Sequence, residues 1–99
     1  MKDITCEELR KRKQSGEDLT IIDVREPWEY EEYNMGAQNI PLSVFQQRVT
    51  ELEPMRDHEI IIHCNTDNRS HVVQQYLERL GFSNVRKLVG GIVEWRRSA

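Results

Sequence analysis

The sequence predicts an α/β fold in which helices flank a mostly parallel sheet. Apolar, β-branched segments alternate along the chain with segments in which apolar residues recur at the period of a helix. Strands that alternate with helices in this way pair in parallel, since each connection must cross over the sheet. A length of 99 residues fits one domain, which we expect to span 1–99.

The first half of the chain contains a clear helix signal and a clear strand signal. Thr5 and Glu8 form the pattern of a capping box, which predicts a helix over 6–14. The segment 19–24 is nearly all apolar and β-branched, as in a parallel strand that is buried on both faces. The other elements expected in this half are a short helix from Pro27 and a short strand over 38–40.

The second half carries the strongest strand and the strongest helix. Residues 59–63 include three consecutive isoleucines and predict a buried strand. Apolar residues share one face over 70–80, and Gly81 stands where a helix commonly ends. The remaining expected elements are a helix opened by a capping box at Ser43, a strand over 85–88 and a short closing helix with Trp95 in the core.

The composition limits the classes of function. The formal net charge is −3, so no basic excess indicates nucleic acid or an anionic membrane as a partner. The longest purely apolar run is Ile60-Ile61-Ile62, and the first residues lack the apolar stretch of a signal peptide. We therefore expect a cytoplasmic protein. Cysteine and histidine pairs at ligand spacing are missing, so we expect no metal site and no cofactor.

The loop that follows the 59–63 strand carries the candidate chemistry. Cys64 comes directly after the strand, where the functional crevice of a parallel sheet lies. Backbone N–H groups in such a loop can converge on an anion, and the dipole of the next helix together with Arg69 favours thiolate over thiol. We expect Cys64 to be the reactive residue. The candidate substrate-binding residues of the loop are Asn65, Thr66, Asp67, Asn68, Arg69 and Ser70.

Three stretches of the chain resemble the signatures of rhodanese-like domains. They are Ile22-Asp23-Val24-Arg25-Glu26-Pro27-Trp28-Glu29-Tyr30 with Gly36–Leu42, Ile61-Ile62-His63-Cys64 with Arg69-Ser70, and Leu88-Val89-Gly90-Gly91-Ile92-Val93-Glu94-Trp95. The resemblance implies a five-stranded, mainly parallel sheet flanked by helices on both faces. It also implies a sulfurtransferase in which Cys64 takes a sulfane sulfur from thiosulfate or a protein persulfide. The sulfur would then pass to a thiol or to cyanide.

The spacing of Cys64 and Arg69 separates two chemistries. Related phosphatases place five residues between the cysteine and the arginine, whereas four separate them here. Because a sulfur anion is smaller than a phosphoryl group, the shorter loop favours sulfur transfer. Asp67 stands where the family commonly has a glycine. We expect Asp67 to tolerate the positive φ of that glycine and its negative charge to oppose anionic donors.

Several alternatives remain open from the sequence. The charge of Asp67 leaves room for a binding or regulatory module that keeps the fold and has little turnover. Arg25 either helps to attract a substrate anion or fixes the turn after the first strand. Cys6 is either a half-buried helix residue or a resolving thiol for Cys64. His63 should point away from Cys64, because successive side chains of a strand face opposite sides of the sheet.

Overall fold

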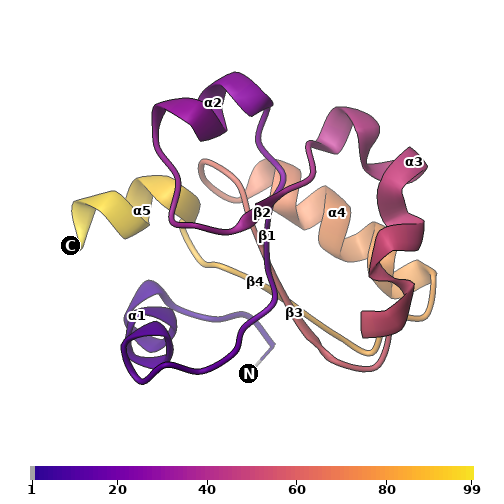
Figure 1. The fold of residues 1–99 in the computed structure, drawn as a ribbon, viewed down its shortest axis with the longest axis horizontal. Coiled ribbons are helices and arrows are strands. Elements are labelled where there is room, and N and C mark those ends of the chain that lie inside the picture. The colour runs from indigo at the N-terminus through magenta and orange to yellow at the C-terminus, as the bar shows by residue number, and fades with distance from the viewer. Residues whose placement is uncertain (1) are drawn as a thin grey trace.

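The computed structural model describes residues 2–99 and contains a parallel sheet between helices (Figure 1). The strands are β1 (Ile21–Asp23), β2 (Gln38–Asn39), β3 (Glu59–His63) and β4 (Asn84–Lys87), in the spatial order β2-β1-β3-β4. Ile61 in β3 lies opposite Ile21 on one side and Arg86 on the other. Because all strand pairs are parallel, the loops that follow the strands gather at one edge of the sheet.

The expected fifth strand is reduced to a single bridge. Ile4 pairs in parallel with Leu88, next to β4. The pairing stops there because α1 (Cys6–Gln14) begins at once, and the Glu8 N–H donates to the Thr5 hydroxyl at 3.1 Å. A helix starts where the strand would have to continue, so the sheet has four strands and not five.

Helices cover both faces of the sheet and pack two apolar clusters against it. Figure 1 shows α1 and α5 (Gly91–Arg97) on one face, and α3 (Phe45–Arg48) and α4 (Asn68–Arg79) on the other. The first face buries Ile61 and Trp95, which confirms the core position expected for this tryptophan. The second face buries Ile60, Ile62 and Cys64. The remaining helix, α2 (Pro27–Glu32), lies beyond the carboxyl ends of the strands.

The segment after β2 differs from the single helix expected from Ser43. It forms the 3-10 turns η1 (Leu42–Val44) and η2 (Val49–Met55) on either side of the one-turn helix α3. The Ser43 hydroxyl donates to the Glu26 carboxylate at 3.1 Å and caps no helix. Pro54 lies inside η2 and lacks an N–H group for helical bonding. The missing cap and this proline explain why no longer α-helix forms.

The start of α4 places a helix N-terminus directly behind Cys64. The helix begins at Asn68, two residues before the expected start at Ser70, with Asp67 at the N-cap. Its apolar face buries Val73 and Leu77 against the sheet.

None of the helices described over residues 2–99 has the length and apolar character of a membrane-spanning helix.

Candidate active site

Cys64 lies at the base of a loop that closes on its own sulfur atom. The Ser70 N–H donates to Cys64 Sγ at 3.3 Å, and the Cys64 S–H donates to Ser70 Oγ at 3.5 Å. Both residues are almost fully buried. The Ser70 hydroxyl also donates to the Asp67 carbonyl at 3.2 Å. A rotation of this hydroxyl would let it donate to the sulfur once Cys64 loses its proton.

The carbonyl groups of the loop face α5. Ile92 and Val93 donate their backbone N–H groups to the carbonyls of Cys64 and Asn65, at 2.9 and 3.0 Å. Gly91 lies so close to the carbonyls of residues 64–66 that a Cβ on it would come within 2.4–2.6 Å of the three oxygens. All peptide bonds described are trans, so each N–H points opposite to the preceding C=O. The N–H groups of residues 65–67 therefore point away from α5.

Five consecutive N–H groups of the loop have no acceptor among the residues that the structure describes. Over residues 2–99, the backbone N–H groups of positions 65–69 make no hydrogen bond, while that of Ser70 reaches Cys64 Sγ. The first turn of α4 adds the partial positive charge of its N-terminus. A loop of unpaired N–H groups beside a helix N-terminus can bind an anion.

Arg69 and Asn65 are both held by Glu29, a residue that the sequence analysis did not select. Arg69 donates from Nη1 and Nη2 to the two Glu29 oxygens at 2.7 and 3.0 Å, and Asn65 Nδ2 donates to Oε2 at 3.0 Å. The Arg69 hydrogen bonds are the main cause that lowers the pKa of Glu29 to about 2. Glu29 also accepts the Glu26 N–H at 2.9 Å, as in a capping box. The sequence offered one signal for Glu29: it stands three residues after Glu26, which is the spacing of a capping box.

Asp67 does not adopt the positive φ that was expected because it stands where rhodanese-like domains commonly have a glycine. Its φ is −128°, and no non-glycine residue described has a positive φ. Its Oδ1 accepts the Gly90 N–H at 3.1 Å and lies 3.6 Å from Lys87 Nζ. The side chain therefore ties the loop to the segment before α5, and Lys87 offsets part of its charge.

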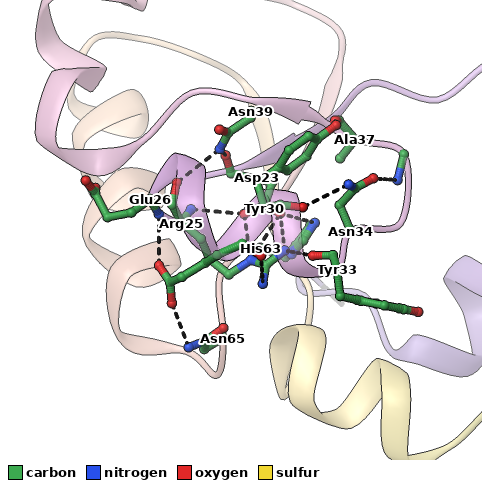
Figure 2. Close-up of polar contacts among 12 residues, drawn as sticks. Asp23, Arg25, Glu26, Tyr30, Tyr33, Asn34, Ala37, Asn39, His63 and Asn65 are labelled. Carbon is green, nitrogen blue, oxygen red and sulfur yellow. Dashed lines mark hydrogen bonds and ion pairs between the residues drawn. The ribbon is translucent and has the colours of Figure 1, made fainter.

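The other candidate residues of the loop and its mouth have different surroundings. Thr66 and Asn68 are exposed. Arg25 is buried: Nη2 donates to Asp23 Oδ2 at 2.8 Å and to the Tyr33 carbonyl at 2.6 Å (Figure 2). These bonds fix the turn after β1, as one of the two interpretations of Arg25 anticipated.

His63 and Cys6 lie on the face of the sheet opposite Cys64. His63 is fully buried beside Asp23 (Figure 2), and burial lowers its pKa, so the ring is neutral at pH 7. The Cys6 S–H points to the Val89 carbonyl at 3.7 Å, and burial raises the pKa of this thiol. Cys6 packs in the cluster of Ile61 and Cys64 in the other cluster, so the sheet separates the two sulfur atoms.

A family model decides the identity of the chain. The model described as the rhodanese-like domain matches residues 5–98. The chain belongs to the rhodanese-like domain family. A solved rhodanese-related protein from Thermoplasma volcanium superposes on this rhodanese-like domain with a TM-score of 0.84 at 29% identity, covering 100% of this chain and 94% of that one.

Two curated relatives have names that refer to sulfur. A sulfurtransferase of Allochromatium vinosum is 30% identical over 96 residues, which are 96% of this rhodanese-like domain and 88% of the relative. The putative sulfur carrier protein YrkF of Bacillus subtilis is 34% identical over 94 residues. That alignment covers 94% of this chain, and the chain spans only half of YrkF. Such relatives support a role in sulfur transfer for this domain.

Proposed function

We propose that the protein carries sulfur as a persulfide on Cys64. The Cys64 thiolate attacks the sulfane sulfur of a donor such as thiosulfate or a protein persulfide. An S–S bond forms to Cys64 while the S–S bond of the donor breaks, and sulfite or a thiolate leaves with the electron pair. An acceptor thiol or cyanide then attacks the outer sulfur and releases the Cys64 thiolate.

The observation that carries this proposal is the set of unpaired N–H groups around Cys64. A persulfide anion places its charge on the outer sulfur, about 2 Å beyond Sγ. Within residues 2–99 the N–H groups of positions 65–69 have no acceptor, and the hydrogen bonds from α5 to the Cys64 and Asn65 carbonyls fix the direction of the first two. Because these donors are held in place before the anion forms, little reorganisation is needed to stabilise it.

The alternative of a binding module with little turnover depended on the charge of Asp67. Its carboxylate accepts the Gly90 N–H and lies near Lys87, so its charge is partly offset. We therefore propose that the protein turns over as a sulfurtransferase and does not act only as a binding module.

The compartment and the partners follow from the same chemistry. Cys64 must return to the free thiol after each transfer, which a reducing compartment permits. We therefore propose the cytoplasm as the location. The partners would be a small sulfur compound or a protein that carries a persulfide.

Mass spectrometry of the donor-treated protein tests the proposal. After incubation with thiosulfate or with an alkyl persulfide, the peptide that contains Cys64 should gain the mass of one sulfur atom. Treatment with a reducing thiol should remove it. Cys64→Ser should abolish the gain, whereas Cys6→Ser should not. Sulfur uptake that persists undiminished in Cys64→Ser would exclude the proposed site.

A further inference from the structure

We propose that Glu29 neutralises Arg69 and so makes the Cys64 loop selective for sulfur donors of low charge, namely alkyl or protein persulfides, over the thiosulfate dianion. This inference rests on the proposed sulfur transfer at Cys64 and specifies its substrate class. It assigns Glu29 a role in donor selection, as a residue that positions Arg69 and cancels its charge.

The contact between Glu29 and Arg69 occupies the groups that would bind an oxyanion. Both terminal nitrogens of the guanidinium face the carboxylate, in the paired geometry that arginine also uses for sulfonate-like or phosphate groups. Asn65, the other loop side chain near Glu29, donates its amide to the same carboxylate. The Glu29 side chain is only 10% exposed and that of Arg69 30%, so water screens this pair less than a surface ion pair.

The remaining charges near the loop do not compensate for the pairing of Arg69. Glu26 accepts the Ser43 hydroxyl on the same side as Glu29. Asp67 faces Lys87 at 3.6 Å on the other side. Glu32 and Arg96 line the same pocket as Glu29 and Asn65. The four carboxylates of Glu26, Glu29, Glu32 and Asp67 thus stand against the three cations Arg69, Lys87 and Arg96, which leaves a net charge of −1.

This charge distribution distinguishes the two donor classes. Thiosulfate brings a charge of −2 and a sulfonate group. Arg69 is the only cation among residues 64–70, and its pairing with Glu29 leaves it unable to bind that group. An alkyl persulfide R–S–SH brings no more than −1 and needs only the backbone N–H groups. The Cys64 thiolate attacks the outer sulfur of R–S–SH. The new S–S bond forms as the old one breaks, the R–S⁻ thiolate leaves with the electron pair, and the proton stays on the transferred sulfur.

The test compares the loading rate of Cys64 by thiosulfate with that by hydroxyethyl persulfide, in the wild type and in two variants. Glu29→Gln removes the charge and keeps one oxygen for Arg69 Nη1 and the Glu26 N–H. We expect it to raise the ratio of the thiosulfate rate to the persulfide rate about tenfold, because one face of Arg69 becomes free. Glu32→Gln removes a charge from the same helix without touching Arg69, and it should change the ratio less than twofold.

Salt provides a second measurement that needs no variant. Like charges repel, so added KCl should accelerate thiosulfate loading of the wild type more than persulfide loading, because thiosulfate carries the larger negative charge. Thiosulfate loading that slows with salt would mean attraction to an available cation and would overturn the inference. An unchanged ratio in Glu29→Gln, with both donors loading Cys64, would overturn it as well while the proposed function stands. Failure of both donors to load Cys64 in the wild type would instead remove the proposed function itself.

Discussion

Gly91→Ala tests whether the segment before α5 sets the position of the Cys64 loop. Gly91 has a φ of +61°, and an added Cβ would lie 2.4 Å from the Thr66 carbonyl oxygen and 2.6 Å from those of Asn65 and Cys64. Real Cβ atoms essentially never approach another group closer than 3.0 Å, so the three carbonyls would have to retreat. The positive φ would cost alanine about 1–2 kcal/mol in addition.

We expect Gly91→Ala to load Cys64 with sulfur about a hundredfold more slowly, since a misplacement of about 1 Å in a reacting site can cost that factor. Mass spectrometry gives the loading rate, and urea denaturation gives the free energy of unfolding. Gly36→Ala is the matched control, because Gly36 has a φ of +91° and no atom lies within 4 Å of its added Cβ. Both variants carry the strain of a positive φ, but only Gly91→Ala displaces the loop. Equal loading rates in the two variants would therefore refute the idea that the position of the loop sets the reactivity of Cys64.

Three further predictions concern the reaction class, one loop residue and acid stability. Cys64-dependent hydrolysis of an aryl phosphate should be absent, because the four-residue spacing to Arg69 leaves no room for a phosphoryl group; steady hydrolysis would contradict this. Asp67→Asn should load sulfur faster than Asp67→Gly, since both variants lack the charge but only asparagine keeps an oxygen for the Gly90 N–H; the reverse order would mean that this hydrogen bond does not position the loop. Two arginines lower the pKa of Glu59 from 4.5 to about 2, so its contribution of up to about 3 kcal/mol to stability is present above pH 4.5 and is lost as the pH falls toward 2. The free energy of unfolding from urea titrations should therefore depend less on pH in Glu59→Gln. Glu53→Gln should keep the dependence of the wild type, because Glu53 pairs with Arg56 on the surface; identical curves in both variants would exclude this role of Glu59 in acid stability.

The fold could be predicted because its signals are local. The alternation of β-branched strands and helical periods fixes the layers, and β3 and α4 lie close to their expected ranges. The helix expected at Ser43 was wrong, because Ser43 finds a partner in Glu26, 17 residues earlier in the chain. The fifth strand was lost to the early start of α1. The partner of Ser43 is distant in sequence, whereas the start of α1 was itself predicted from Thr5 and Glu8, and only the resemblance had implied a fifth strand.

The candidate site shows the same limit. Cys64 and its loop are contiguous in sequence, so their approach to a helix N-terminus could be anticipated. Glu29 was missed because it lies 40 residues from Arg69, and only the folded chain brings the two together. The positive φ considered for Asp67 was wrong: its φ is −128°, and its side chain accepts the N–H of Gly90, 23 residues away. Long-range polar partners of a loop are not encoded near it.

Transfer of a labelled sulfur atom tests the role of Cys64 most directly. The protein is loaded with radiolabelled sulfane sulfur, freed of the donor, and mixed with one equivalent of a low-molecular-weight thiol. We predict that the label leaves the Cys64 peptide and appears in the thiol as a persulfide at the same rate, and that Cys64→Ser neither holds nor transfers label. A label that stays on Cys64, or that transfers from Cys64→Ser, would contradict sulfur transfer through a Cys64 persulfide.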